Sequence, residues 1–424
     1  MNLRNSFEII THKLDNGLQI VLVPKNDAEI ISMNIAYKVG AKNELKGKTG
    51  MAHLFEHLMF EGSKNVPKGE FDKICSLAGG TNNAYTSYDY TAYTMTVPSN
   101  QLELALWLES DRMLEFAVTE EAMETQKKVV SEEIRQTVFD RPYGKWRELL
   151  ATHSFTGDCS YSWEVHGSIN DVLSVELDYL KDFFQMYYRP GNAILTLSGK
   201  FEKDNAIALI EKYFAKIENK TTDSRRPIFN KNMLRNGGYA SFKDAVPLPA
   251  TFINFHIPDM LDDRILVANI ISQIATQGRS SRLYSDLVER KQMASSLGSY
   301  VDEREYTSLL TFYGITSEPT IDINLLKAEM LGIIAKFADE PVQEFELQRA
   351  VNQLSMQVAN EIQYSSGLAD IASSYLLFSD DLERIYGILE RYKKITPEDI
   401  RAFANDFLVA NSEIVIDCLP EGIS

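Results

Sequence analysis

At 424 residues the chain is longer than a single hydrophobic core supports, so two or more domains are expected. Hydrophobic residues make up 44% of it, as in folded globular proteins, which excludes a mainly disordered chain. The net charge of −17 argues against nucleic acid and anionic membranes as partners, because phosphate contacts need clustered Lys and Arg. The charge is best explained as keeping a large protein in solution, and a preference for cationic peptides is the alternative.

Targeting and anchoring segments are not visible in the sequence. No run approaches about 18 consecutive apolar residues, so no membrane span is expected. Residues 1–8 lack both the apolar core of a signal peptide and the Arg-rich pattern of a transit peptide. We therefore expect a cytoplasmic protein, with the periplasm as the alternative if a leader has been removed. Cys75, Cys159 and Cys418 form neither a CxxC pair nor a disulfide framework, which predicts free thiols.

Strand and helix patterns alternate through the first half of the chain. An Asp-Asn-Gly turn at residues 15–17 joins two alternating runs, which predicts a β-hairpin over residues 11–25. The Tyr- and Thr-rich residues 84–98 are typical of one strand or a pair of strands. Further strands are expected at 32–44 and 192–199, helices at 50–61, 101–137, 175–188 and 205–217, and a loop around Pro67 and Gly69.

The second half repeats this order loosely. Its predicted elements are strands at 250–258, 295–303, 308–316 and 412–420, a helix at 264–277, and long helices from 325 onward. The polar residues 218–230 are predicted to be a linker. We therefore expect an α+β fold of two homologous units related by duplication, each a mostly antiparallel sheet with helices packed on it. Residues 1–217 would form an N-terminal unit with a metal site, and residues 231–424 a C-terminal unit without one.

The most informative motif is His-Leu-Phe-Glu-His at residues 53–57. On a helix His53 and His57 lie on one face, close enough to bind one metal ion. Glu56 projects toward the same side and can reach a metal-bound water as a general base. This order is the inverse of the commoner HExxH motif. The alternative is a core helix with two hydrogen-bonded histidines, which the glutamate between them disfavours.

Catalytic zinc usually has three protein ligands, so a third is expected on another element. The helix pattern at residues 120–139 has an inward stripe and a polar face that includes Glu132. The stripe consists of Gln126, Val130, Glu133, Ile134 and Thr137. A carboxylate on a core-facing stripe is rare unless it is paired or bound to a metal. Glu133 is therefore the candidate third ligand, and an ion pair with an arginine is the alternative.

With these residues the chain resembles the pitrilysin/insulinase family of HxxEH zinc metallopeptidases, which includes the mitochondrial processing peptidases. The family pattern places a glutamate 76 residues after the second histidine, and here that residue is Glu133. The resemblance extends over nearly the whole chain. It includes the segments LDNGLQIVLVP, GGTNNAYTSYDYTAY, RPGNAILTLSG and GRSSRLYSDLVERKQ.

The resemblance implies one zinc ion per chain, with Glu56 as the base that activates water. The implied zinc ligands are His53, His57 and Glu133. It also implies an edge strand that pairs with the backbone of an extended oligopeptide substrate. The residues of that strand are Asn83, Ala84, Tyr85 and Thr86. An ordinary packed strand is the alternative for this segment. Members of the family enclose a chamber that admits unfolded peptides and excludes folded proteins.

Two departures from the family pattern concern catalysis. Many relatives have a second glutamate seven residues before the metal-binding one, where this chain has Gln126, an amide that can still orient a ligand. Members whose C-terminal half completes the active site have an arginine and a tyrosine, which align with Val288 and Ser295. Neither side chain can stabilise an oxyanion. The chain therefore resembles the zinc-bearing subunit of a bacterial heterodimer whose partner lacks HxxEH and keeps the Arg/Tyr pair; a homodimer is the alternative.

The predicted function is that of a zinc endopeptidase that hydrolyses unstructured oligopeptides. One alternative is a non-catalytic structural subunit that retains the fold, which the complete ligand set and Glu56 disfavour. Another is a dedicated maturase that trims one specific peptide. Metal content separates the first alternative from an enzyme, and cleavage of unrelated peptides separates the second from a general peptidase.

Overall fold

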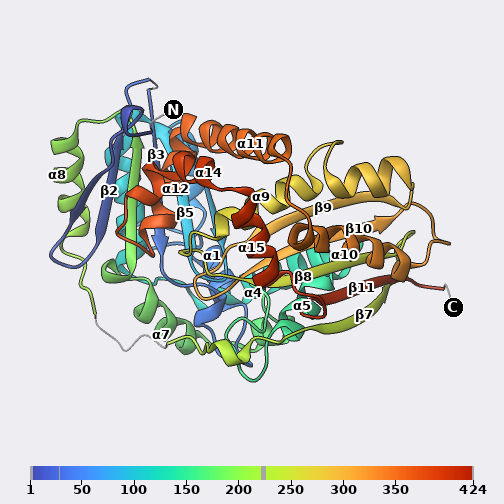
Figure 1. Cartoon of the computed structure of the whole chain (residues 1–424). Coiled ribbons are helices and arrows are strands. Elements are labelled where there is room, and N and C mark those ends of the chain that lie inside the picture. Colours follow the sequence, from blue (N-terminus) through green and yellow to red (C-terminus); the bar gives the residue numbers. More distant parts are fainter. Residues whose placement is uncertain (1–2, 28, 221–225, 423–424) are drawn as a thin grey trace. The chain divides into compact units, whose positions relative to one another are not determined.

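The structure is a computed structural model that describes residues 3–27, 29–220 and 226–422. The chain forms two units, each built around its own β-sheet (Figure 1). Unit 1 comprises Met1–Ile134, Glu164–Pro227 and Val358–Ile388. Unit 2 comprises Arg135–Trp163, Ile228–Gln357 and Leu389–Ser424. The predicted α+β class is confirmed: both sheets are mostly antiparallel and carry packed helices.

The sheet of unit 1 has six strands in the order β1-β2-β6-β3-β5-β4. All neighbours are antiparallel except β2 and β6, which are parallel. The whole of β6 and residues 20–23 of β2 are buried, so part of the core lies around these strands, whereas β4 is an edge. The strands are β1 (Ile10–Lys13), β2 (Gln19–Pro24), β3 (Ile30–Tyr37), β4 (Thr81–Thr86), β5 (Thr91–Pro98) and β6 (Ala193–Gly199).

The hairpin predicted over residues 11–25 is present as β1 and β2. Gly17 in its turn has a φ of 94°, a left-handed value that glycine adopts without strain. Asn16 donates hydrogen bonds from Nδ2 to the carbonyl oxygens of Phe214 (2.8 Å) and Ile217 (3.0 Å). The turn is thus favoured by its own residues and then held in place by hydrogen bonds to a distant segment.

The predicted helices are present. Helix α2, which follows the predicted loop, and helices α5 and α6 were not predicted from the sequence. The helices of the first half are α1 (Met51–Leu58), α2 (Glu70–Leu77), α3 (Leu102–Leu114), α4 (Glu120–Ile134), α5 (Trp146–Ser154), α6 (Ile169–Ser174), α7 (Leu177–Tyr187) and α8 (Lys203–Phe214). Those of the second half are α9 (Ile265–Thr276), α10 (Ile323–Asp339), α11 (Glu344–Gln363), α12 (Ser365–Leu376), α13 (Glu383–Tyr386), α14 (Ile388–Lys394) and α15 (Pro397–Phe407). None of the helices in the described residues is long and apolar enough to cross a bilayer.

The sheet of unit 2 has five strands in the order β7-β11-β8-β10-β9, and only β7 and β11 are parallel. Its strands are β7 (Gly238–Asp244), β8 (Ala250–Ile257), β9 (Ala294–Asp302), β10 (Ser308–Thr316) and β11 (Ile414–Pro420). When β1 is set aside, both sheets connect their strands in the same way: the first strand pairs in parallel with the last, and the second, fourth and third follow. This shared connectivity supports the predicted duplication.

The two halves of the chain exchange a helix. Helix α12, from the second half, packs on β3 and β6 of unit 1, where it lies in front of the sheet in Figure 1. Helix α5, from the first half, packs on β7 and β11 of unit 2. The predicted ranges 1–217 and 231–424 do not include this exchange, because a local pattern does not reveal which sheet a helix will cover. The unit boundary after Pro227 falls within the predicted linker 218–230.

Candidate metal centre

Helix α1, which carries the HxxEH motif, begins at a glycine and is held by a buried carboxylate. Gly50 has a φ of 82°, and a Cβ there would lie 2.5 Å from the carbonyl oxygen of His166, so only glycine fits. Glu44, which is 4% exposed, accepts hydrogen bonds of 2.8 Å from the N–H groups of Gly50 and Ala52. A carboxylate at this position pairs N–H groups that a helix start leaves free and complements the helix dipole. The first turn of α1 is therefore fixed in position.

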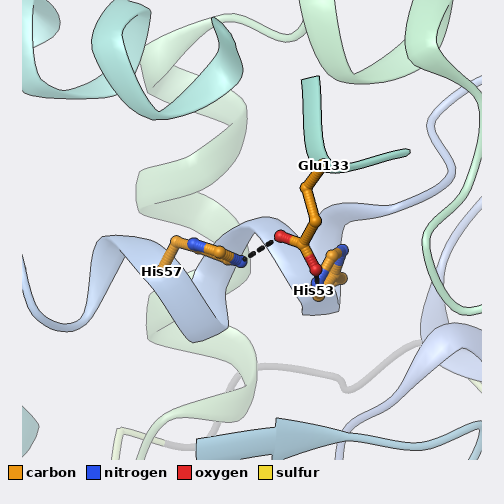
Figure 2. Close-up of side chains that lie close together, drawn as sticks. All are labelled: His53, His57 and Glu133. Atoms are coloured by element: carbon orange, nitrogen blue, oxygen red, sulfur yellow. Dashed lines mark ion pairs between the residues drawn. The ribbon is translucent and has the colours of Figure 1, made fainter. Parts of the chain in front are cut away.

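The two histidines lie on one face of α1, as their spacing predicts. The apolar residues of the helix, Met51, Ala52, Leu54, Phe55 and Leu58, are all buried. The rings of His53 and His57 are 5.1 Å apart and nearly perpendicular, at 82°. Because the apolar side anchors the helix in unit 1, both imidazoles point the same way, toward α4 (Figure 2).

Glu133 of α4 lies opposite both imidazoles (Figure 2). Its Oε2 is 3.2 Å from Nε2 of His57, and its Oε1 is 3.7 Å from Nε2 of His53. One ligand atom from each residue lies within 4.8 Å of the others. Within the described residues no other group of His, Cys, Asp and Glu side chains has this metal-binding arrangement. Two imidazole nitrogens and one carboxylate are a donor set found in catalytic zinc sites.

The electrostatics of the three residues suit metal binding. Burial lowers the pKa of His53 to about 4, although the charge of Glu133 acts in the opposite direction. The neutral imidazole, which is the form that binds a metal, is therefore favoured. The hydrogen bond with His57 holds the pKa of Glu133 below its ordinary value. The side chain of Glu133 is 40% exposed, against 13% for His53, so the site opens toward solvent on the Glu133 side.

The predicted inward-facing stripe is present on helix α4, but it does not continue beyond the last residue of the helix, Ile134. The buried or half-buried residues on it include Gln126, Val130, Glu133 and Ile134. Glu132 is exposed, as predicted. Thr137 is also exposed, so its predicted inward position is wrong. The reason is that Arg135–Phe139 form a π-helical turn, whose extra residue rotates the helix face and buries Val138 instead.

The predicted general base, Glu56, lies against the edge strand β4. Its Oε2 accepts a hydrogen bond of 2.7 Å from Oγ1 of Thr86. Burial raises the pKa of the Glu56 carboxyl, and the hydrogen bond from Thr86 opposes that change. A cavity of about 240 Å³ is lined by Glu56, His57 and Phe60 together with residues 82–84 of β4. The Glu56 carboxylate therefore lies beside both His57 and the edge strand β4.

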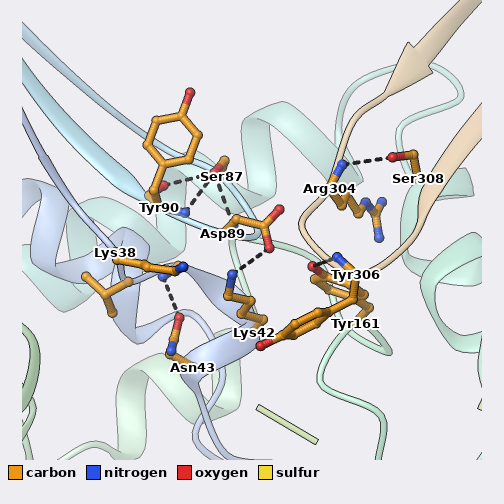
Figure 3. A network of polar contacts seen from close by, with 12 residues as sticks. Lys38, Lys42, Asn43, Ser87, Asp89, Tyr90, Tyr161, Arg304, Tyr306 and Ser308 are labelled. Carbon is orange, nitrogen blue, oxygen red and sulfur yellow. Dashed lines mark hydrogen bonds and ion pairs between the residues drawn. The ribbon is translucent and has the colours of Figure 1, made fainter. Parts of the chain in front are cut away.

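Polar contacts hold the turn that follows β4 (Figure 3). Oγ of Ser87 accepts hydrogen bonds from the N–H groups of Asp89 (3.2 Å) and Tyr90 (3.0 Å). Nζ of Lys42 donates to Oδ1 of Asp89 at 2.9 Å, and both side chains are at most 5% exposed. Because a buried ion pair fixes the turn, it also fixes Thr86, the residue that precedes the turn and bonds to Glu56.

Gln126, predicted to orient a metal ligand, bonds to another residue in the structure. Its Nε2 donates to Oε1 of Glu61 at 2.6 Å, and Nζ of Lys68 lies 2.6 Å from the other oxygen of that carboxylate. The amide oxygen of Gln126 is buried and has no hydrogen-bond partner among the described residues. A role for Gln126 toward the metal ligands therefore stays a prediction.

Some residues near the site were missed by the sequence analysis. Glu44 could have been suspected, since an acidic residue shortly before a predicted helix often pairs the first N–H groups. His166 was assigned no function, yet its charge lowers the pKa of both His53 and Glu133. No spacing signal marks it.

The residues at the places of the family's arginine and tyrosine lie in unit 2. Val288 lies in a π-helical turn, and Oγ of Ser295 donates to the carbonyl oxygen of Thr316 at 2.9 Å.

Comparison with known proteins gives a consistent result. The family model described as "Insulinase (Peptidase family M16)" matches residues 20–149, and the model "Peptidase M16 inactive domain" matches residues 174–354. The zinc protease PqqE of Helicobacter pylori is 28% identical over 398 residues, which cover 93% of this chain and 89% of that protein.

Solved structures have the same fold. The crystal structure of a protease from Helicobacter pylori has a TM-score of 0.92 and 26% identity, and covers 98% of this chain and 100% of that one. The periplasmic protease PqqL from Escherichia coli has a TM-score of 0.78 at 19% identity, over 97% of this chain and 47% of that one. The chain therefore belongs to the insulinase family of peptidases, peptidase family M16.

Proposed function

We propose that this chain is a zinc-dependent endopeptidase that hydrolyses unstructured oligopeptides, with zinc held by His53, His57 and Glu133. The observation that carries the proposal is the convergence of two imidazole nitrogens and a carboxylate within 4.8 Å, beside a fourth side chain that can act as base. The name of the zinc protease PqqE of Helicobacter pylori supports the choice of metal and reaction. The burial that keeps His53 neutral supports the fit of a divalent cation to these donors.

Glu56 is the proposed general base. Bound zinc would polarise the peptide carbonyl and lower the pKa of a water molecule. The Glu56 carboxylate takes the proton of the attacking water and passes it to the leaving amine nitrogen. Thr86 holds this carboxylate at the strand edge through its hydrogen bond of 2.7 Å. Burial raises the pKa of Glu56, which brings its proton affinity closer to that needed for transfer near neutral pH.

The edge strand β4 is the proposed binding site for the substrate backbone. Asn83, Ala84, Tyr85 and Thr86 all lie in β4, whose outer side has no neighbouring strand among the residues that the structure describes. An extended peptide can add to such an edge through main-chain hydrogen bonds, which do not depend on sequence. A folded protein cannot present an unpaired strand in this way, so unstructured oligopeptides are the proposed substrates. Enclosure of the substrate in a chamber is part of the same proposal.

A partner subunit is proposed because two positions that align with the family's oxyanion-stabilising residues differ in this chain. Val288 and Ser295, at the places of the family's arginine and tyrosine, carry no charge. A homologous subunit without HxxEH that retains this pair would complete the site, and a homodimer is the alternative.

The periplasmic location stated for the relative PqqL of Escherichia coli makes the periplasm as reasonable a compartment for this chain as the cytoplasm.

The test combines metal content with peptide cleavage. Zinc per chain is measured for the wild type and for His53→Ala, His57→Ala and Glu133→Ala. Glu132→Gln is the matched control, because it changes the adjacent, exposed carboxylate of the same helix. Loss of zinc in the three ligand variants, but not in the control, is the expected result. Full zinc content in all three ligand variants would refute the ligand assignment.

Activity is measured with a quenched fluorescent, unstructured peptide, and Glu56→Gln is the inactive control. Zinc-dependent cleavage that vanishes in Glu56→Gln supports the proposed enzyme, and cleavage by the isolated chain at full rate would refute the need for a different partner. A zinc-loaded chain that cleaves no peptide, alone or with a homologous Arg/Tyr-bearing subunit, would point to a structural role. Cleavage of one peptide among many unrelated ones would indicate a dedicated maturase.

A further inference from the structure

We propose that a second cavity on unit 1, on the opposite face of β4 from the metal centre, is a subsite for a cationic substrate side chain, with Asp370 as its anionic partner. This inference rests on the proposed function, and specifically on the addition of a peptide strand to β4. The substrates selected by this subsite would be peptides with lysine or arginine at positions whose side chains face Asp370.

Successive side chains of β4 point to opposite faces of the sheet. Toward the metal centre, Thr86 donates to Glu56, and Asn82 donates to Asp72 at 2.9 Å. Tyr85 points the other way, and its hydroxyl donates to Oδ1 of Asp370 in α12. Because side chains alternate along any strand, a peptide paired with β4 also presents every second side chain to the Asp370 face.

A cavity of about 350 Å³ lies on that face. Its walls are residues of β3, β4 and β5 on the sheet side and the first two turns of α12 on the other. The sheet side is polar, with hydroxyl and amide groups that include Ser32, Asn34, Thr94 and Thr96. Asp370 is the single charged residue of the lining, and the lining contains no lysine, arginine or histidine. The cavity therefore has polar walls and a net negative charge.

The hydrogen bonds within the cavity leave acceptors free. Oδ1 of Asp370 accepts from Tyr85 and, at 3.1 Å, from Nδ2 of Asn34, while no described residue donates to its Oδ2. Asn34 is 1% exposed, and its own Oδ1 is buried without a hydrogen-bond partner in the described parts of the chain. A buried amide oxygen without a partner is unfavourable, as is a half-buried carboxylate without a cation. Burial also raises the pKa of Asp370, as expected of a carboxylate that lacks a cation.

A substrate lysine or arginine supplies what the cavity lacks. Cross-strand neighbours have Cβ atoms about 5 Å apart, so a side chain opposite Tyr85 enters beside the Tyr85–Asp370 contact. The ammonium or guanidinium group can form a charge-assisted hydrogen bond with the free Oδ2 of the Asp370 carboxylate. The net charge of −17 draws cationic peptides to the chain in general, but only the cavity selects the position of the cation along the peptide.

The experiment measures peptide binding by the zinc-loaded Glu56→Gln chain, which cannot consume the peptide. Fluorescent peptides of low sequence complexity carry one lysine, moved by one residue from peptide to peptide, and the matched set carries glutamine instead. A lysine peptide is expected to bind roughly tenfold more tightly than its glutamine counterpart when the lysine stands at every second position of the series, and equally tightly when it stands at the positions between. Asp370→Asn is expected to bring this ratio close to one. Glu361→Gln, a change in a nearby exposed carboxylate outside the lining, is expected to preserve it.

Other outcomes decide against the subsite. A lysine preference that is equal at all positions would show only the general attraction of an acidic protein, and a preference that survives in Asp370→Asn would exclude that carboxylate. If Asp370→Asn does not fold, Thr94→Lys places a cation in the same cavity from a half-buried strand position. It is expected to abolish the lysine preference, and a retained preference would refute the inference. Zinc content and cleavage are measured separately on the wild type, so failure of the subsite is distinguishable from failure of the proposed peptidase function.

Discussion

The hydrogen bond between Thr86 and Glu56 provides the sharpest test of the proposed catalytic geometry. Thr86→Val removes the hydroxyl that donates to the Glu56 carboxylate at 2.7 Å but keeps the shape and strand propensity of the side chain. A hydrogen bond to a charged group contributes about 1.5–3 kcal/mol. If most of this energy positions the base in the transition state, kcat falls about 10- to 100-fold, because each 1.4 kcal/mol corresponds to about a factor of ten.

The same substitution predicts the direction of a change in the pH profile. Burial raises the pKa of Glu56, and the hydrogen bond from Thr86 lowers it, so its removal leaves the pKa higher still. A general base acts in its deprotonated form, and activity therefore rises as pH increases through this pKa. The acidic limb of kcat/KM is expected to move to higher pH in Thr86→Val.

The assay follows cleavage of a quenched fluorescent peptide by the complete enzyme, with its partner subunit if one is needed, over a range of pH and substrate concentration. Zinc content is determined for each variant. Thr86→Ser, which restores a hydroxyl, is expected to recover most of the rate, and KM should change little. An unchanged kcat in Thr86→Val, or an acidic limb that moves to lower pH, would refute the positioning of Glu56 by Thr86.

Four further predictions follow from the fold and the metal centre. Glu44→Ala leaves two N–H groups at the start of α1 without their hydrogen bonds, so urea unfolding should show a loss of about 2–4 kcal/mol, with weaker zinc binding; unchanged stability would contradict this. Gly50→Ala should destabilise the chain by at least about 1–3 kcal/mol in thermal unfolding, because its φ is 82° and the new Cβ meets the His166 carbonyl. Burial lowers the pKa of His256 from 6.5 to about 4. Between these pH values the unfolded chain therefore binds a proton that the folded chain does not bind. The free energy of unfolding should consequently fall by up to about 3 kcal/mol as the pH is lowered from 6.5 to 4. His256→Gln should reduce this pH dependence in urea titrations at the two pH values. Removal of zinc with a chelator should abolish cleavage, and added zinc should restore it; activity that persists without metal would exclude the proposed mechanism.

Much of the fold was predictable because its elements have clear local signals. The Asp-Asn-Gly turn and two alternating runs predict the β1–β2 hairpin, which is present. The loose repeat of strand and helix patterns predicts two related units, and the two sheets share one connectivity. Prediction fails where the backbone departs from regular α-helical geometry. The π-helical turn at Arg135–Phe139 exposes Thr137, although regular helical spacing places this residue inward.

The candidate metal residues were also predictable, because their spacing carries the chemistry. His53 and His57 share a helix face through a separation of four residues, and Glu133 stands out as a carboxylate on an inward stripe. The structure brings all three together. Their roles as zinc ligands, and that of Glu56 as base, remain proposals until metal content and activity are measured.

The sequence by itself indicated most of the strands and helices and the side chains with metal-binding spacing, since both depend on neighbours a few positions apart. Only the tertiary structure decided which helix covers which sheet, with α12 on the sheet of unit 1 and α5 on that of unit 2. It alone paired Thr86 with Glu56, and Tyr85 with Asp370 at a separation of 285 residues. Such contacts arise from packing between distant segments, and periodicity and residue type in a single sequence do not specify them.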